Sequence, residues 1–388
     1  MPAAPNVALP AAFVAYTGRA GLRATGDDVA VVASRRPCAS VGLFTQSRFA
    51  GPSVTLSRFR AATGRARGVA VVAKNANVAT GDQGMADAVE VADLAARAAG
   101  IRGEEMLLAS TGVIGRPYPM PLLRDHLSGV VPARFTAHAG HVARAMMTTD
   151  TVAKVAERTV GAARVVGVAK GVGMVEPDMA TMLAFVFTDA ELDPEWMASA
   201  WRGAVDDTFN CLSVDTDTST SDTAVLLANA AAGPVDAGGL AAALREVCLD
   251  LTLQLARDGE GATKLLTVTV LEARDRGQAR RVAKSVLNSP LVKTAVHGAD
   301  PNWGRVAMAV GKCQDDRDID PSRVVIRLGD LELYPGGVDD DALGRLRKVM
   351  EEDHVDIEVE LATGPAQATV YGCDLSAGYV RINADYTT

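Results

Sequence analysis

The residues best suited to covalent chemistry lie in one segment, residues 170–183, which reads KGVGMVEPDMATML. Two glycines after Lys170 permit a tight turn, Pro177 stiffens the approach, and the apolar run after Thr181 predicts a buried strand. Thr181 is therefore expected where a loop meets a strand. Its hydroxyl, held against the carbonyl of the small residue Ala180, could attack that carbonyl in an N-to-O acyl shift whose ester is then hydrolysed.

Cleavage of this kind would leave Thr181 with a free α-amino group. The unperturbed pKa of an α-amino group is about 7.7 to 8.0, so this amine can serve as the base for the threonine's own hydroxyl near neutral pH. The pattern thus predicts an N-terminal nucleophile that needs no separate histidine. Local chemistry leaves a second interpretation open, a glycine-containing loop that only precedes a strand.

Alternating strands and helices must position this segment. Short β-branched runs predict strands at 29–34, 68–73, 163–169, 265–273, 323–329 and 355–362. Apolar residues at three- and four-residue spacing predict helices at 85–99, 135–147, 193–207, 239–257 and 339–350. The fold class is therefore α/β or α+β, and adjacent strand runs favour mixed sheets.

Length, charge and cysteine content limit the size class, the binding partners and the location of the protein. A length of 388 residues suggests two or three packed lobes, and no linker rich in proline, glycine or serine divides them. The net charge of -8 argues against nucleic acid or an anionic membrane as the main partner, so a small-molecule substrate is expected. With no signal peptide or long apolar run, the cytoplasm is the expected location, and five dispersed cysteines indicate reduced thiols.

Metal and nucleotide sites are not expected. His138 and His141 could share a helix face, but no carboxylate or cysteine stands at ligand spacing beside them. Asp215, Asp217 and Asp222 lack the central glycine and terminal glutamate of an EF-hand loop. A nucleotide-binding module that uses KGVG as a phosphate loop is disfavoured because both GxGxxG and GxxxxGK[ST] are missing.

The segment KGVGMVEPDMATML resembles the signature of the ornithine acetyltransferase family, the glutamate N-acetyltransferases of the cyclic arginine pathway, which cleave themselves before this threonine. Further stretches resemble the family in order along the chain: KNANVATGDQG, STGVIG, MMTTDT, DTDTSTSDT, DGEGATK, NSPLVKTAVHGADPNWGRV and YGCDLSAGYVRINADYTT. Glu-Pro-Asp before Met-Ala-Thr makes the chain look closest to the paralogues of clavulanic acid-type antibiotic clusters. KNAN at 74–77 and Ser221 depart from the wider family and leave the pathway open.

The resemblance implies an ornithine acetyltransferase-like fold of mixed sheets sandwiched between helices, with a smaller second α/β domain. It also implies cleavage into an α chain, 1–180, and a β chain, 181–388, which share one core and are not independent domains. Oligomers of such αβ units, as in a heterotetramer, are expected by the same resemblance.

By resemblance, Thr111 and Gly112 form an oxyanion hole, the first through its hydroxyl and the second through its backbone N–H. The substrate-binding positions of the family are matched by Thr148, Lys170, Thr181, Glu260, Asn383 and Thr388. Lys170 suits the substrate's α-carboxylate and Glu260 its ammonium group. Because Asn383 and Thr388 lie in the last six residues, the carboxyl terminus is expected to fold back into the site. Taken alone, STGVIG also fits a plain turn, and the lysine and glutamate fit solvated charges.

The implied activity is a ping-pong transfer of the acetyl group from N2-acetyl-L-ornithine to L-glutamate through an acetyl-Thr181 ester, without acetyl-CoA or a metal. An N-terminal-nucleophile amidase or aminopeptidase, with water as the acceptor, is the alternative. The segment DPNWGR, with Asp300, Asn302, Trp303, Gly304 and Arg305, fits structural bracing and a substrate loop equally well.

Overall fold

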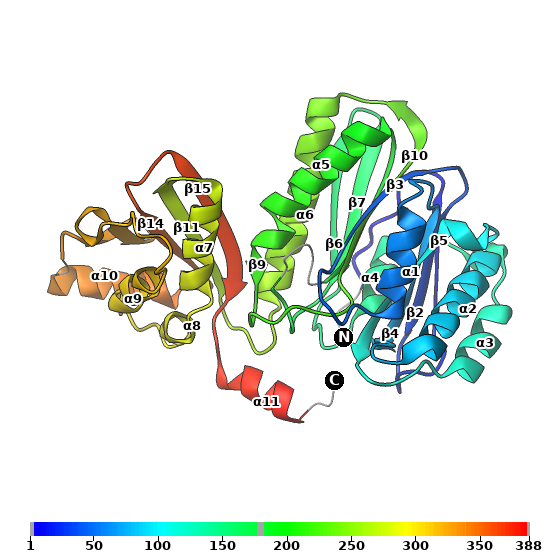
Figure 1. Cartoon of the computed structure of the whole chain (residues 1–388), viewed down its shortest axis with the longest axis horizontal. Helices are drawn as coiled ribbons and strands as arrows, with labels where there is room; N and C mark the ends of the chain where they lie inside the picture. Colours follow the sequence, from blue (N-terminus) through cyan, green and yellow to red (C-terminus); the bar gives the residue numbers. More distant parts are fainter. Residues whose placement is uncertain (1–3, 177–181, 338, 386–388) are drawn as a thin grey trace. The chain divides into compact units, whose positions relative to one another are not determined.

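The computed structural model describes residues 4–176, 182–337 and 339–385 (Figure 1). The chain divides into two compact units. The first takes in the described parts of Met1–Asn210 and Asp217–Leu251, and the second takes in Cys211–Thr216 and the described part of Thr252–Tyr386. The smaller second α/β domain expected from the sequence is the second unit.

One sheet of the first unit has the strand order β1 (Phe13–Gly18), β2 (Val29–Ser34), β4 (Gly68–Asn75) and β5 (Met106–Val113). β4 and β5 are parallel, and the other neighbours are antiparallel. All of β2 is buried, as its uninterrupted apolar run predicts for a strand covered on both faces. Apolar residues of α2 (Gly81–Ala99) and α3 (Met120–Ser128) join residues of this sheet in one buried cluster.

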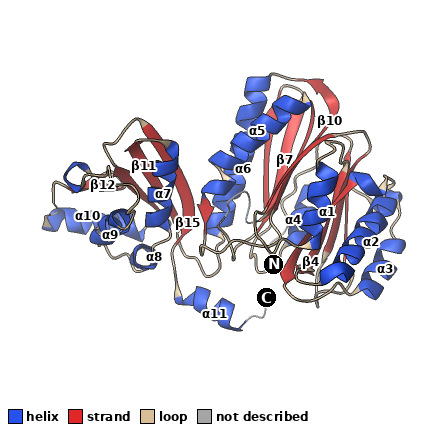
Figure 2. Ribbon diagram, viewed as in Figure 1, coloured by secondary structure: helices blue, strands red, loops and turns tan. Residues whose placement is uncertain are grey.

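The other sheet of this unit has the order β3 (Ala39–Phe44), β10 (Thr223–Pro234), β8 (Leu183–Glu191), β7 (Ala163–Lys170) and β6 (Lys154–Val160). β8 is the buried strand that the sequence predicts after Thr181, and it pairs antiparallel with β7 and parallel with β10. Figure 2 shows α5 (Pro194–Asp207) and α6 (Ala237–Arg257) beside this sheet. A side chain at Gly167 of β7 would meet Val247 and Leu251 of α6, so the helix packs closely there.

The core between the two sheets is one cluster of buried side chains. It joins Val69 and Val71 of the first sheet to Phe185 and Phe187 of the second, and α1 (Pro52–Ala61) and α4 (Ala139–Met146) contribute to it. The predicted class, mixed sheets sandwiched between helices, is confirmed.

The second unit is built on a six-stranded mixed sheet of order β13-β12-β14-β11-β15-β9. Its strands are β13 (Leu331–Tyr334), β12 (Val325–Leu328), β14 (His354–Glu360), β11 (Leu265–Ala273), β15 (Ala366–Cys373) and β9 (Leu212–Ser213). Its helices are α7 (Arg276–Leu287), α8 (Pro290–His297), α9 (Gly304–Gly311), α10 (Asp340–Glu351) and α11 (Ala377–Asp385). Residues of the sheet and of α7 to α10 form a separate buried cluster.

The helix predicted at 135–147 begins later than expected, at Ala139. Thr136 exchanges two backbone hydrogen bonds with Ala15 at the edge of the first sheet, and His138 forms a bridge with Ala8. Pairing with the amino-terminal segment is a tertiary interaction that helical spacing cannot reveal. The other predicted strands and helices are present with shifts of a few residues at their ends.

Among the described residues, no helix combines the length and the hydropathy needed to cross a membrane. The division into chains 1–180 and 181–388 stays a prediction.

Replacing Phe187 tests the core between the sheets. Its side chain is fully buried and packs against Phe13, with ring centroids 5.3 Å apart. Phe187→Ala should lower the free energy of unfolding by about 3–5 kcal/mol, because it opens a cavity between rigid sheets. Phe59→Ala is the matched control, since Phe59 is 78% exposed, and it should change stability by less than about 0.5 kcal/mol. Urea denaturation measures both, and equal effects would contradict this assignment of the core.

Candidate active site

Thr111 and Gly112 lie near the end of β5, where its ladder with β4 becomes irregular. Gly112 has φ +132°, and a Cβ there would lie 2.3 Å from the carbonyl carbon of Lys74. No other residue fits that backbone and that close approach. Lys74 itself has φ +75° and stands at the shift in register. The geometry therefore fixes an unusual backbone beside Thr111, a placement typical of functional sites.

Lys170 ends β7 on the other sheet of the same unit, and its side chain is largely buried. Its Nζ donates a hydrogen bond of 3.2 Å to the Thr111 Oγ1. The structure thus brings together two residues that the sequence assigned to different tasks, oxyanion binding and carboxylate binding.

Thr148 follows α4 and is held through its backbone. Lys74 Nζ donates to the Thr148 carbonyl at 2.6 Å. Just before Thr148 in the chain, the carbonyls of Met147 and Ala145 accept hydrogen bonds from the Arg23 guanidinium, at 2.7 Å and 3.1 Å. The carboxyl end of α4 is therefore held next to the irregular end of β4.

Asp150 is a residue of this cluster that the sequence analysis did not single out, although it lies in the family-like stretch MMTTDT. Its carboxylate is fully buried and accepts hydrogen bonds from Lys154 Nζ at 2.9 Å, from the Gly171 N–H at 3.0 Å and from the Thr148 N–H at 3.0 Å. Lys170 Nζ lies 3.9 Å away. A lysine four positions after the aspartate is the sequence signal that could have pointed to it.

Two opposing effects act on the pKa of Asp150. Burial raises it, and the nearby ammonium groups of Lys170 and Lys154, with the two backbone N–H groups, lower it by more. The net pKa lies well below the usual aspartate range, so the group is ionised at neutral pH. An ionised carboxylate thus fixes the position of Lys170 and of the backbone at Gly171.

Glu260 and Asn383 belong to the second unit, and the structure brings them together. Asn383 Nδ2 donates to Glu260 Oε2 at 2.8 Å, and Glu260 is largely buried although Asn383 is exposed. Gly261 has φ +70°, and a Cβ there would lie 2.3 Å from the Tyr379 nitrogen of α11. The loop that carries Glu260 therefore packs closely on α11, near the carboxyl end of the chain.

Ala180, Thr181 and Thr388 lie outside the described residues. The loop that approaches the predicted cleavage point is described as far as Glu176. The Glu176 N–H donates a hydrogen bond to the Asp217 carbonyl at 3.0 Å, and the Thr218 hydroxyl donates to the Glu176 carbonyl at 3.2 Å. The stretch DTDTSTSDT thus anchors this loop.

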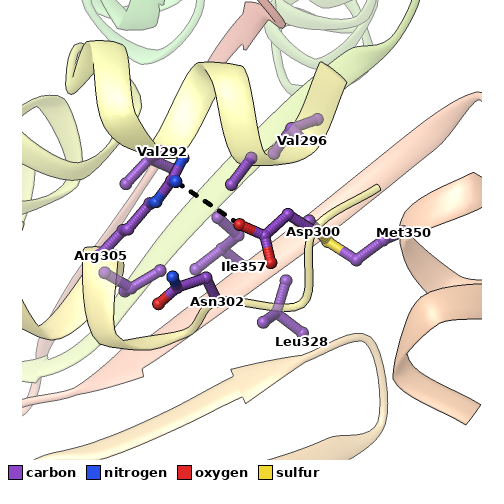
Figure 3. Close-up of a pocket in the computed structure, with 10 residues that line it drawn as sticks. Val292, Val296, Asp300, Asn302, Arg305, Leu328, Met350 and Ile357 are labelled. Atoms are coloured by element: carbon purple, nitrogen blue, oxygen red, sulfur yellow. Dashed lines mark ion pairs between the residues drawn. The ribbon is translucent and has the colours of Figure 1, made fainter. Parts of the chain in front are cut away.

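The segment DPNWGR lines a small hollow in the second unit (Figure 3). Arg305 pairs with Asp300 at 3.5 Å and donates a hydrogen bond of 2.7 Å to the Leu291 carbonyl of α8. The hollow is also lined by side chains that are almost fully buried, among them Val296 and Ile357. Trp303 stacks on Tyr334, with centroids 5.6 Å apart. These contacts favour the bracing interpretation.

The rings of His138 and His141 stack at 3.8 Å. Within the described ranges, no group of three or more histidine, cysteine, aspartate or glutamate residues is arranged so that it could hold a metal ion.

The profile of the ArgJ family matches residues 14–388. The chain belongs to the ArgJ family. It is 52% identical over 379 residues to the arginine biosynthesis bifunctional protein ArgJ 2 of Nostoc sp., with 98% of both chains covered. It is 54% identical over 385 residues to the glutamate N-acetyltransferase Oat2 of Streptomyces clavuligerus, again with 98% of both covered. Among solved structures, an ArgJ protein of Bacillus halodurans is 37% identical, with a TM-score of 0.48, and covers 52% of this chain and 98% of its own.

The family resemblance stated from the motifs is therefore confirmed. The site roles stay predictions for Thr111, Gly112, Thr148, Lys170, Thr181, Glu260, Asn383 and Thr388.

Replacing Asp150 tests the charge cluster. In Asp150→Asn, Lys154 loses a carboxylate inside a fully buried pair, so the free energy of unfolding at pH 7 should fall by about 3–5 kcal/mol. The folded pKa of Asp150 is depressed, so its contribution is complete above the unfolded pKa of about 3.9 and disappears as the pH falls toward the folded value. The difference from wild type should therefore narrow below about pH 4.

Denaturant unfolding at several pH values measures this. Asp125→Asn, on the exposed surface of α3, is the matched control and should leave stability nearly unchanged. A wild-type advantage that stays constant down to pH 3 would contradict the depressed pKa of Asp150.

Proposed function

We propose that this ArgJ-family chain is a self-processing acetyltransferase that moves the acetyl group from N2-acetyl-L-ornithine to L-glutamate through an acetyl-Thr181 intermediate. The observation that carries the proposal is the hydrogen bond between Lys170 and Thr111, beside the glycine-only backbone of Gly112. This contact places the Lys170 ammonium, which suits a substrate carboxylate, beside Thr111 and Gly112, which suit an oxyanion. A glutamate N-acetyltransferase among the chain's relatives supports the same activity.

Self-cleavage before Thr181 is compatible with the fold. β7 and β8, which precede and follow the predicted cut, are antiparallel partners along Val165–Lys170 and Leu183–Thr188. Phe185 and Phe187 after the cut share a core with Val69 and Val71 before it. The fragments 1–180 and 181–388 would therefore stay associated after the bond breaks.

The proposed chemistry needs one nucleophile and one pair of donors. The α-amine of Thr181 takes the proton from its own Oγ, which attacks the acetyl carbonyl and forms a C–O bond. Charge gathers on the carbonyl oxygen, where the Thr111 hydroxyl and the Gly112 N–H donate hydrogen bonds. The C–N bond then breaks, and ornithine leaves with the proton. Glutamate's amine attacks the ester in the second half-reaction and regenerates the threonine.

Substrate binding follows from charge. Lys170, held by Asp150, takes the α-carboxylate, and Glu260 takes the side-chain ammonium of the ornithine moiety. Thr148, Asn383 and Thr388 complete the proposed binding set.

The relatives named for arginine biosynthesis favour that pathway. The Glu-Pro-Asp before Met-Ala-Thr, which resembles the paralogues of antibiotic clusters, keeps an antibiotic pathway as the alternative. We extend the proposal to a cytoplasmic assembly of αβ pairs in a heterotetramer. Hydrolysis with water as acceptor, the amidase or aminopeptidase reaction, is the competing activity.

Self-cleavage is tested by the intact mass of purified wild type beside Thr181→Ala. Wild type should give two fragments, 1–180 and 181–388, because the hydroxyl needed for the acyl shift is present. The variant should give one uncut, inactive chain. An active wild-type protein that stays uncut would contradict the mechanism.

The acceptor is tested by following N-acetylglutamate and free acetate after addition of N2-acetyl-L-ornithine and L-glutamate. The proposal expects N-acetylglutamate in step with ornithine release, with parallel reciprocal plots typical of a ping-pong reaction. Acetate as the sole acyl product would establish the hydrolase alternative instead.

A further inference from the structure

The loop 258–264, DGEGATK, has its conformation imposed by tight packing on both sides of Glu260. A Cβ at Gly259 would lie 2.6 Å from the Cys373 Sγ. A Cβ at Gly261 would meet the backbone of Gly378 and Tyr379. The Ser376 hydroxyl also donates to the Gly261 carbonyl. Segment 373–379 therefore packs against the residues on both sides of Glu260 and holds the loop in place.

One buried carboxylate in that segment binds the far end of the loop. The Asp374 side chain is fully buried and accepts hydrogen bonds from the Thr263 N–H at 2.7 Å, the Thr263 hydroxyl at 2.6 Å and the Lys264 N–H at 3.0 Å. Burial raises the pKa of Asp374, but these hydrogen bonds and that from His297 lower it by more, so the net shift is downward. The ionised carboxylate thus fixes two successive loop amides.

The fourth hydrogen bond of the Asp374 carboxylate comes from the end of a helix. His297, the last residue of α8, lies with its Nδ1 2.7 Å from Asp374 Oδ2. Arg305 of the DPNWGR segment in turn donates to the Leu291 carbonyl and lies 3.3 Å from the Thr294 hydroxyl, both on α8. The bracing segment therefore holds the helix whose final residue holds Asp374.

These groups do not form a nucleophilic triad. The Thr263 hydroxyl donates to Asp374, and its oxygen is 3.4 Å from the same His297 nitrogen that faces the carboxylate. A relay would need the hydroxyl at the opposite ring nitrogen. The arrangement suits positioning, with Asp374 as the centre.

We propose that Asp374, oriented by His297, is a positioning residue that holds the Glu260 loop and so sets the preference for acyl donors with a cationic side chain. The inference rests on the proposed function, in which Glu260 receives the ammonium of the ornithine moiety. Loss of the Asp374 charge releases Thr263 and Lys264, and Glu260 then loses its fixed orientation toward the cation.

The experiment compares two acyl donors, N2-acetyl-L-ornithine and N2-acetyl-L-norvaline, which differ only by the terminal amino group. Wild type should prefer the ornithine compound in kcat/KM. Asp374→Asn should reduce that preference by about tenfold, mainly by raising KM for the ornithine compound, because the lost interaction concerns only the cation. Its kcat/KM for the norvaline compound should stay near the wild-type value.

Two substitutions of His297 sharpen the test. His297→Ala removes the donor and should lower the preference in the same direction. His297→Asn retains an N–H near the position of Nδ1 and should restore most of it. Asp330→Asn, in the exposed turn between β12 and β13, is the matched control and should keep the wild-type preference.

The outcomes separate the two hypotheses. An unchanged preference in folded Asp374→Asn, or an equal loss with both donors, would overturn the positioning role. If Asp374→Asn does not fold, the His297 pair decides, and equal preferences in His297→Ala and wild type would reject the inference. Failure of wild type to transfer acetyl from N2-acetyl-L-ornithine to glutamate would instead reject the proposed function.

Discussion

The first unit depends on one buried carboxylate. Asp150 lies at zero side-chain exposure beside Lys154, with Lys170 also close, and it accepts two backbone N–H groups. Buried ammonium groups are costly unless a carboxylate compensates them, so Asp150 offsets the cost of burying Lys154, at the start of β6, and Lys170, at the end of β7. Asp150 thereby holds Lys170 within hydrogen-bonding distance of Thr111. It also binds the backbone N–H of Gly171, where the loop toward residue 181 begins.

Irregular backbone surrounds this charge. Gly112 and Gly171 have φ of +132° and +138°, and Lys74 and Met174 are non-glycine residues at positive φ. Such conformations cost free energy and persist because regular strands fix the chain on either side. The proposed site thus combines regular strands with a strand end whose hydrogen-bonding pattern is irregular, a setting in which backbone groups can bind a ligand.

The second unit uses the same physical device in a different place. Asp374 is buried, ionised and saturated by the Thr263 and Lys264 amides, the Thr263 hydroxyl and His297. In both units a buried carboxylate with a lowered pKa fixes a loop by accepting hydrogen bonds from the loop's backbone N–H groups. Lys170, a proposed substrate residue, lies 3.9 Å from Asp150, and Glu260, the other, lies in the loop that Asp374 binds.

The sequence by itself determined what depends on local pattern. β-branched runs located the strands, including the buried strand Leu183–Glu191 after the proposed nucleophile, and the ordered motifs placed the chain in its family. Only the tertiary structure decided which side chains meet. Asp374 binds Thr263 from 111 positions away, and Lys170 reaches Thr111 across 59. The start of α4 at Ala139 was likewise decided by pairing of Thr136 with Ala15. Local spacing carries no information about such contacts, because burial and charge compensation depend on what the rest of the fold brings beside each residue.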